Sequence, residues 1–284
     1  MEMKGKNVVI TGGNSGIGLE AAVAIASVGA SVWIVSRDER RGRDAVETIR
    51  KRGGNPAVEL LVADLSSQAA IHALADRIAS DVERIDVLVN NAGLTVGERI
   101  LTVDGLETTF AVNHLAYFLL TGRLVELLKS NAPCRIVNVA SQAHLRGTMN
   151  WDDLQGEHGY SGWSAYCQSK LANVLFTVEL ARRLEGSGVT ANCLHPGVVA
   201  TNFANKGPAF IRWVFKLLRP VLTTPADGAK TTVFLATSDD VASVSGKYFD
   251  KCREAATSAE ARSAENARRL WEISERLTGF TWPG

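Results

Sequence analysis

The chain has 284 residues, with 31 Lys and Arg against 30 Asp and Glu, so its formal net charge is +1. A nearly balanced charge gives no reason to expect a nucleic-acid partner, and this length is enough for a single domain, residues 1–284, with a large buried core. The segment before the first apolar run has no signal-peptide pattern, and no apolar run reaches the ~18 residues of a membrane span. These features predict a cytoplasmic protein without a transmembrane anchor.

Apolar, β-branched segments alternate with helical segments along the chain. The expected strands are 7–10, 31–36, 58–63, 85–90, 134–140, 189–194 and 246–250, and the expected helices are 16–29, 39–52, 67–81, 103–129, 163–186, 226–237 and 254–278. Repeated strand–helix units predict an α/β fold, a Rossmann-type, doubly wound parallel sheet with helices on both faces. Ligands then bind beyond the carboxyl ends of the strands.

A glycine-rich turn follows the first expected strand. It reads Thr11-Gly12-Gly13-Asn14-Ser15-Gly16-Ile17-Gly18, with the glycine spacing Gly12-x3-Gly16-x-Gly18. A strand, a glycine turn and a helix N-terminus present backbone N–H groups to a pyrophosphate. The same turn could also be an ordinary tight connection, because its spacing is not G-x-G-x-x-G.

The end of the second expected strand indicates the nucleotide. An acidic residue there normally holds a free ribose 2′-hydroxyl, but this chain has Ser36 followed by Arg37. A guanidinium can bind a 2′-phosphate with two hydrogen bonds, and Arg40 and Arg41 add positive charge. We therefore expect NADP(H) rather than NAD(H). Arg37 could instead be a solvated charge, and Asp38 or Glu39 could turn toward the ribose.

Tyr166 and Lys170 are four residues apart on an expected helix, so they share a face. A lysine ammonium beside a phenol favours the phenolate and lowers the tyrosine pKa from its usual value of roughly 10. Such a pair suits general acid/base chemistry.

The four cysteines, Cys134, Cys167, Cys193 and Cys252, have no metal-ligand spacing, so we expect reduced, mostly buried thiols and no metal site.

Further motifs complete a recognisable set. Asn90-Asn91-Ala92-Gly93 follows the fourth expected strand, Asn113 lies about twenty residues later, Ser141 follows the fifth strand, and His195-Pro196-Gly197 follows the sixth. With the glycine turn and the Tyr166/Lys170 pair, this set resembles the short-chain dehydrogenase/reductase superfamily over about residues 5–250.

The resemblance implies roles for these residues. Tyr166 would exchange a proton with the substrate oxygen, Lys170 would lower its pKa and bind the nicotinamide ribose, Ser141 would stabilise the oxyanion, and Asn113 would hold a water in a proton relay. The resemblance also implies an adenine contact from Asp64, which could alternatively cap the following helix. The full expected cofactor set is Gly12, Asn14, Ser15, Gly16, Ile17, Gly18, Ser36, Arg37, Asp64, Leu65, Asn91, Ala92, Gly93, Tyr166, Lys170, Pro196, Gly197, Val199 and Thr201.

Two inserts, 142–162 and 199–225, interrupt the alternation, and long inserts in compact folds are usually functional loops. The first lengthens the separation of Ser141 and Tyr166 beyond the usual spacing. With Trp151-Asp152-Asp153-Leu154-Gln155 and the sequence around Tyr166, it resembles the retinol-dehydrogenase-like branch. The inserts carry the aromatic residues Trp151, Trp163, Phe203, Phe210, Trp213 and Phe215, expected to form a lid over an apolar pocket or else an interface or core.

Together these features predict an NADP(H)-dependent oxidoreductase acting on a hydrophobic aldehyde, ketone or alcohol. The resemblance also implies a homodimer or a homotetramer as the oligomeric state. One alternative is a non-catalytic NADP(H)-binding regulator. Another is an epimerase or dehydratase, although the chain has no larger substrate domain.

Overall fold

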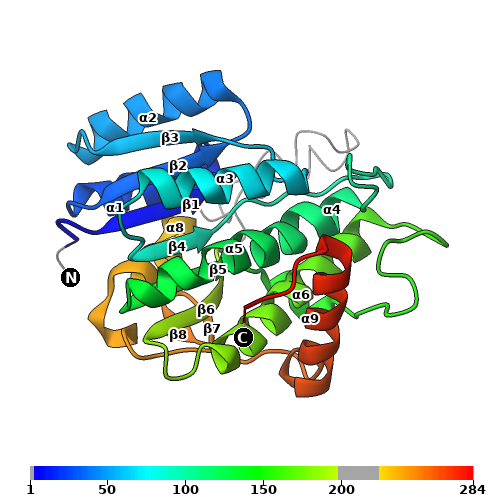
Figure 1. Cartoon of the computed structure of the whole chain (residues 1–284). Coiled ribbons are helices and arrows are strands. Elements are labelled where there is room, and N and C mark those ends of the chain that lie inside the picture. The colour runs from blue at the N-terminus through cyan, green and yellow to red at the C-terminus, as the bar shows by residue number, and fades with distance from the viewer. Residues whose placement is uncertain (1–2, 198–223, 284) are drawn as a thin grey trace.

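The computed structural model describes residues 3–197 and 224–283, and an eight-stranded sheet forms its centre (Figure 1). The strand order is β3-β2-β1-β4-β5-β6-β7-β8. All neighbouring strands are parallel except β7 and β8. The strands are β1 (Asn7–Thr11), β2 (Ser31–Ser36), β3 (Val58–Val62), β4 (Val87–Asn90), β5 (Cys134–Val139), β6 (Val189–His195), β7 (Tyr248–Asp250) and β8 (Arg253–Glu254).

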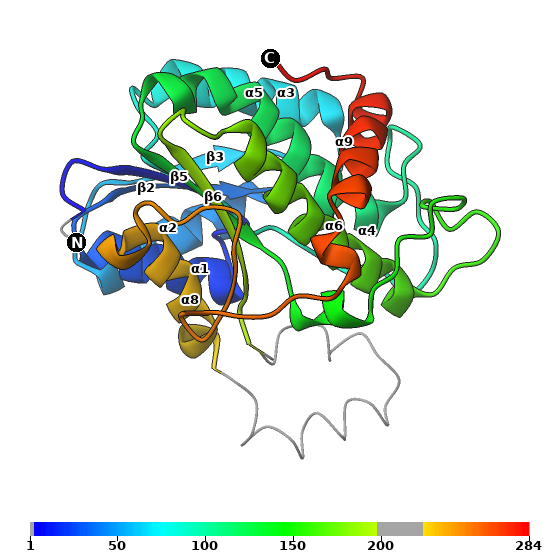
Figure 2. The same cartoon turned by 90° about the horizontal axis from the view of Figure 1, so that it is seen from below.

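Helices cover both faces of the sheet (Figure 2). One layer contains α1 (Gly16–Ser27), α2 (Glu39–Gly53) and α8 (Pro225–Thr237), and the other contains α3 (Gln68–Asp81), α5 (Ala116–Ser130) and α6 (Gly162–Arg183). The remaining elements are α4 (Thr108–Phe110), the π-helix η1 (Ala111–Leu115), the 3₁₀ turns η2 (Gln142–Arg146), η4 (Asp239–Val241) and η5 (Glu260–Arg262), and α9 (Ala264–Thr278). The expected α/β, doubly wound class is confirmed.

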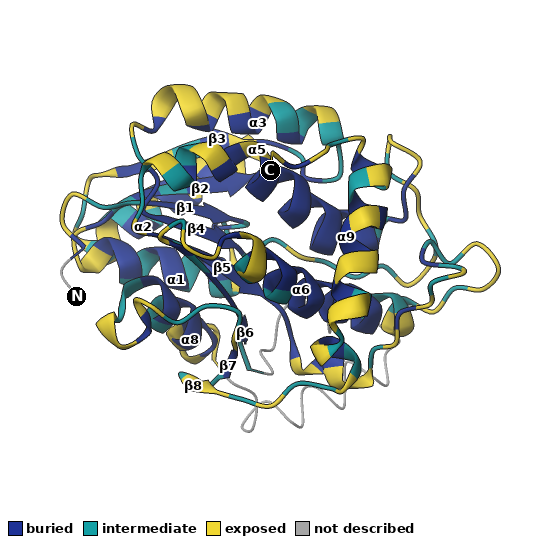
Figure 3. Cartoon of the chain, turned by 60° about the horizontal axis from the view of Figure 1, so that its bottom comes forward, coloured by how far each residue is buried: buried dark blue, intermediate teal, exposed yellow. Residues whose placement is uncertain are grey.

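Alternation along the strands produces the two layers of the core. Val8 and Ile10 of β1 pack with α1, α2 and α8, whereas Val9 between them packs with α3, α5 and α6. Side chains of a strand point to opposite faces in turn, so an unbroken apolar run fills both layers. A third cluster joins α6 to α9, and Figure 3 shows α5 and α6 as the most deeply buried helices.

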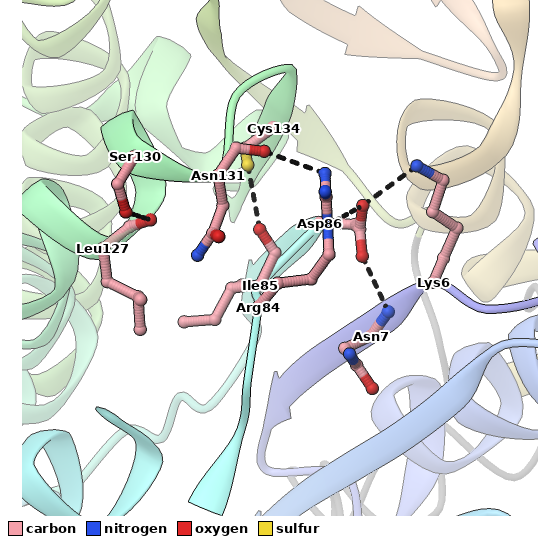
Figure 4. A network of polar contacts seen from close by, with 9 residues as sticks. All are labelled: Lys6, Asn7, Arg84, Ile85, Asp86, Leu127, Ser130, Asn131 and Cys134. Carbon is pink, nitrogen blue, oxygen red and sulfur yellow. Dashed lines mark hydrogen bonds and ion pairs between the residues drawn. The ribbon is translucent and has the colours of Figure 1, made fainter. Parts of the chain in front are cut away.

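The buried carboxylate of Asp86 joins strands at the end of the sheet where the parallel strands begin, opposite the end where the glycine turn and the other sequence motifs lie (Figure 4). Asp86, 4% exposed, accepts hydrogen bonds from Lys6 Nζ (3.0 Å), Arg84 Nε (2.9 Å) and the Asn7 backbone N–H (2.9 Å). Arg84 also donates to the Asn131 carbonyl, and the Cys134 thiol donates to the Ile85 carbonyl. These bonds hold the starts of β1, β4 and β5 together.

The expected helix 103–129 was wrong at its start. Gly105 has a φ of 76°, and its N–H bonds back to Thr102, so residues 102–105 form a turn. The Glu107 carboxylate then caps α4 by accepting from the N–H groups of Thr109 and Phe110. The helical segment therefore begins at Thr108.

The expected C-terminal helix 254–278 was wrong over its first ten residues. Lys251 and Cys252 both have positive φ, and they turn the chain back into β8, which the sequence analysis missed. Ser263 caps α9, so the helix begins at Ala264. The other expected elements agree with the structure to within a few residues.

Candidate active site

The expected site residues that the structure describes lie at the end of the sheet where the parallel strands finish. The glycine turn follows β1, Ser36 and Arg37 follow β2, and Asp64 follows β3. Asn91 to Gly93 follow β4, Ser141 follows β5, and Pro196 and Gly197 follow β6. Since these strands are parallel, their carboxyl ends meet at the same edge. Val199 and Thr201 lie outside the described residues, as does most of the second insert.

The glycine turn leaves the N-terminus of α1 open. Ser15 is the N-cap residue, but its side chain makes no capping hydrogen bond, and no acidic residue lies in the first turn. By contrast, side chains cap α2, α3, α6, α8 and α9. Gly16 has a φ of 55°, and a methyl group placed on it would meet no atom within 4 Å. Free N–H groups beside open space fit a pyrophosphate, and the residues present therefore fit a dinucleotide.

Asn91 and Ala92 brace this turn from β4. Asn91 Nδ2 donates to the Thr11 carbonyl at 2.8 Å, and the N–H groups of Asn91 and Ala92 donate to Thr11 Oγ1. A methyl group on Gly18 would collide with the Gly12 carbonyl and the Asn91 side chain, so glycine is needed for this close approach. The side-chain amide of Asn91 thus fixes the shape of the turn.

The end of β2 offers a guanidinium and no uncommitted acid. Arg37 is 71% exposed, and its NH1 atom lies 4.0 Å from Asp64 Oδ2. The Asp38 carboxylate caps α2 by accepting from Arg41 N–H, and Glu39 pairs with Arg43. Ser36 is buried and donates its hydroxyl to the Asp38 carbonyl. Both acids that could have turned toward a ribose are therefore engaged elsewhere.

Asp64 is bound locally and also faces Arg37. Its Oδ1 accepts from the N–H and the hydroxyl of Ser66, while Oδ2 remains near the guanidinium. Ser67, not Asp64, caps α3. Leu65 is buried in the core, so only its backbone could contact a nucleotide.

Ser141 has two roles in the structure. It is the N-cap of η2, where its Oγ accepts from Ala143 N–H at 3.1 Å. The same side chain forms a hydrogen bond with Tyr166, which lowers the pKa of the phenol. Burial raises that pKa by more, so the net shift of the Tyr166 pKa is upward. The expected lowering by Lys170 is absent from this balance: Lys170 Nζ donates to the Val139 carbonyl and lies 5.8 Å from the Tyr166 ring centroid.

Lys170 is 3% exposed, and its Nζ donates to the Val139 carbonyl at 2.9 Å. The ammonium lies 5.8 Å from the centroid of the Tyr166 ring. Burial lowers the lysine pKa to about 7. A buried lysine with a pKa near neutrality is typical of functional sites.

Asn113 lies in the π-helix η1, where local unwinding is often associated with function. Its Nδ2 donates to the Leu94 carbonyl and to Ser169 Oγ, both at 2.9 Å, and its Oδ1 accepts from Leu94 N–H at 2.8 Å. The amide therefore connects the segment after β4 to the Tyr166/Lys170 helix. A Cβ atom on Gly93 would lie 3.3 Å from Asn113 Oδ1 and 3.5 Å from Lys170 Nζ.

The first insert is fixed to the body of the protein rather than hinged over it. Glu107 N–H donates to Gln155 Oε1, and the Tyr160 hydroxyl donates to the Glu107 carboxylate. Gln168 of α6 bonds to the backbone of Asn150 and Leu154. These contacts favour the packed alternative over a lid for residues 142–162.

Trp151 of the first insert and Trp163, which directly follows the insert, have different surroundings. Trp151 packs under Arg269 of α9, with the guanidinium 4.7 Å from its ring centroid. Trp163 is 51% exposed and stacks on Tyr166, with ring centroids 6.1 Å apart. Of these two tryptophans, Trp163 is the one that contacts the Tyr166 phenol. Phe203, Phe210, Trp213 and Phe215 lie outside the described residues.

Sequence reasoning missed three buried residues around the site. The Tyr117 hydroxyl donates to the Ala92 carbonyl, and burial and the neighbouring Tyr166 raise its pKa. His114 and Asn173 lie behind Lys170. The sequence offered one feature that could have identified Tyr117: it lies four residues after Asn113, and positions four apart share a helix face.

Within residues 3–197 and 224–283, no three His, Cys, Asp or Glu side chains gather as metal ligands. The helices of the same ranges include none that is both long and apolar enough to span a bilayer.

The fold and this arrangement of Ser141, Tyr166 and Lys170 define a dehydrogenase-type dinucleotide site. The model of the short chain dehydrogenase family matches residues 6–210, and the chain belongs to this family. Retinol dehydrogenase 12 of Mus musculus is 43% identical over 282 residues, which cover 99% of this chain and 89% of that relative. Retinol dehydrogenase 11 of Homo sapiens is 43% identical over 280 residues, covering 99% and 88%. The chain thus falls in the retinol-dehydrogenase-like branch, as expected.

Solved structures agree with this assignment. An uncharacterized protein from Mycobacterium Paratuberculosis superposes with a TM-score of 0.81 at 35% identity, over 100% of this chain and 97% of that one. Pseudomonas aeruginosa RhlG, solved with NADP, gives a TM-score of 0.71 at 26% identity, over 87% and 95%. A short chain dehydrogenase from Escherichia coli CFT073, complexed with NADPH, gives 0.70 at 27% identity, over 89% and 98%.

Proposed function

We propose that the protein is an NADP(H)-dependent oxidoreductase that interconverts hydrophobic aldehydes or ketones with the corresponding alcohols. The observation that carries this proposal is the hydrogen bond between Ser141 and Tyr166 beside the buried Lys170. Family membership supports the reaction class, because dehydrogenases of this family use a nicotinamide cofactor.

The residues have complementary tasks in this reaction. The glycine turn and Lys170 would hold a nicotinamide dinucleotide, which would supply or take up the hydride. In reduction, the Tyr166 hydroxyl gives its proton to the substrate oxygen as negative charge develops there, and in oxidation it removes the proton. Ser141, bonded to Tyr166, donates a hydrogen bond to the same oxygen. Protonated Lys170 stabilises the phenolate that remains after reduction.

Asn113 completes the proposed set. Its amide holds the segment containing Gly93 against α6, and its Oδ1 and Lys170 Nζ both lie beside Gly93, 3.3 Å and 3.5 Å from a Cβ atom placed on that glycine. A water bound there would link the ammonium to solvent, as the resemblance implies. Proton return to Tyr166 would then pass through Lys170.

NADP(H) preference rests on the end of β2. Arg37 is exposed, and the two acids that follow it are engaged within α2. A 2′-phosphate would compete with Asp64 for Arg37 and should prevail, because the exposed Arg37–Asp64 contact is long at 4.0 Å, whereas a phosphate can form two charge-assisted hydrogen bonds with one guanidinium. The NADP and NADPH complexes among related structures are consistent with this preference.

The substrate class rests on Trp163. The half-exposed indole of Trp163, stacked on Tyr166, makes the surface beside the phenol apolar. Relatives named retinol dehydrogenases make retinal and retinol sensible members of the first test panel.

The test measures NADPH oxidation against aliphatic, aromatic and isoprenoid aldehydes and ketones, with NADH in parallel and Tyr166→Phe as the blank. Turnover that requires Tyr166 and prefers NADPH is the expected result. Nucleotide binding without turnover of any carbonyl or alcohol would contradict the enzyme proposal and favour a regulatory protein.

A further inference from the structure

A series of buried polar side chains leads away from the Val139 carbonyl, to which Lys170 donates. The Val139 carbonyl accepts two donors, Lys170 Nζ at 2.9 Å and Asn173 Nδ2 at 3.3 Å. Asn173 is fully buried, three residues after Lys170 on α6. The carbonyl that anchors the lysine is therefore shared with a side-chain amide.

His114 is the next buried polar residue in this series. It follows Asn113 in η1, is fully buried, and packs its ring beside Phe110 and Phe176. Its Nε2 lies 2.8 Å from Ser274 Oγ of α9. Burial lowers the His114 pKa to about 3, and the neighbouring Asn173 side chain acts in the opposite direction on this pKa. The ring is thus neutral near pH 7 and carries one proton, on either Nε2 or Nδ1.

The two tautomers leave different groups unsatisfied. With the proton on Nε2, His114 donates to Ser274, whose own hydroxyl donates to the Leu270 carbonyl at 2.7 Å. His114 Nδ1 and Asn173 Oδ1 are then both buried acceptors without a partner at normal hydrogen-bond geometry. Buried unpaired acceptors are costly, which disfavours this tautomer.

The other tautomer satisfies these atoms. With the proton on Nδ1, His114 can donate to Asn173 Oδ1, a buried acceptor that has no other partner among the described residues, and Ser274 donates to Nε2. The Leu270 carbonyl lies inside a helix, where the backbone supplies a donor. Every hydrogen bond then runs in one direction, from Ser274 through His114 and Asn173 to the Val139 carbonyl.

We propose that His114 is a positioning residue that carries its proton on Nδ1 and aims the Asn173 amide at the Val139 carbonyl, so that α9 helps to hold Lys170 in place. The hydrogen-bond chain stands independently of the reaction, whereas its catalytic effect rests on the proposed function. A reversed Asn173 amide would direct an oxygen at the carbonyl and disturb the lysine anchor.

The first experiment reads the tautomer directly. Long-range ¹H–¹⁵N correlation spectra of protein labelled at its five histidines distinguish Nδ1–H from Nε2–H, and His114→Phe assigns the signal. Wild type is expected to show Nδ1–H. Asn173→Leu removes the acceptor and should move the proton to Nε2, whereas Ser274→Ala should leave it on Nδ1. An Nε2–H signal in the wild type overturns the proposal, whatever the activity of the protein.

The second experiment reads catalysis on the best carbonyl substrate. Asn173→Leu should lower kcat about tenfold or more with little change in the carbonyl KM, because the reacting groups are misplaced without loss of ground-state binding. Asn138→Leu is the matched control: Asn138 is equally buried and also loses two amide hydrogen bonds, to Asn90 and Thr177, but does not touch the Val139 carbonyl. Equal losses of kcat in the two variants would contradict a positioning role.

Discussion

The indole of Trp163 stacks on the phenol of Tyr166, with ring centroids 6.1 Å apart and planes inclined by 29°. Trp163 nevertheless remains half exposed at the first turn of α6. The face of the Tyr166 phenol is therefore continued by an exposed aromatic surface.

Replacement of Trp163 by alanine should weaken the binding of large apolar substrates more than that of small ones. We expect the KM for long-chain or isoprenoid aldehydes to rise about tenfold with kcat nearly unchanged, because the contact is equal in the ground and transition states. Steady-state kinetics over an aldehyde length series measures this. Trp151→Ala is the control, since Trp151 packs on Arg269 instead. A rise in KM that is the same for all chain lengths would contradict the assignment.

Replacement of Arg37 by alanine should reduce the preference for NADPH. Loss of a charge-assisted hydrogen bond to a phosphate should weaken NADPH binding about 10- to 100-fold and leave NADH binding little changed. Titration calorimetry with both nucleotides measures the ratio. Asp64→Asn removes the carboxylate 4.0 Å from Arg37 and should tighten NADPH relative to NADH. Equal losses for both nucleotides in Arg37→Ala would place this guanidinium away from the 2′ position.

Lys170 should make stability depend on pH. Its pKa is about 7 in the folded protein, below the unfolded value near 10.4. Between these values the unfolded chain binds the additional proton, so the lysine disfavours folding below pH 7 and this penalty is lost as pH rises. The free energy of unfolding of the cofactor-free protein should gain a slope approaching about 1.4 kcal/mol per pH unit from this residue.

Urea unfolding of the wild type and Lys170→Met at several values between pH 7 and pH 9 isolates that slope. Other titrating groups, such as Cys193, whose pKa burial raises to about 12, are common to both proteins and cancel in the difference. Parallel pH curves for the two proteins would show that Lys170 keeps an ordinary pKa.

Replacement of Asp86 by alanine should destabilise the fold without altering the site. Lys6 and Arg84 would lose their common partner, and both are about one-third exposed, which limits the cost to about 2–3 kcal/mol. Urea unfolding measures this change, with Asp76→Asn as the control for a largely exposed pair with Arg123. Nucleotide affinity at a temperature where both proteins are folded should be unchanged, because Asp86 lies at the opposite edge of the sheet.

The sequence alone predicted the doubly wound sheet and its family. Unbroken apolar runs such as β1, glycines required by close approaches, and side chains placed after strand ends are local properties of the chain. The candidate site was also accessible, because parallel strands bring the residues after their carboxyl ends to one edge, and Tyr166 and Lys170 share a helix face. The roles of individual site residues and the NADP(H) preference stay predictions.

Tertiary structure decided what these residues do to one another. Burial, which depends on packing from distant segments, raises the Tyr166 pKa and lowers that of Lys170. The carboxylates of Asp38 and Asp64 were ambiguous in sequence, and only their contacts with Arg41 and with Ser66 and Arg37 assigned them. The path from Ser274 through His114 and Asn173 to the Val139 carbonyl joins α9, η1, α6 and β5. No periodicity in the sequence encodes it, because these groups meet only when the helices pack on the sheet.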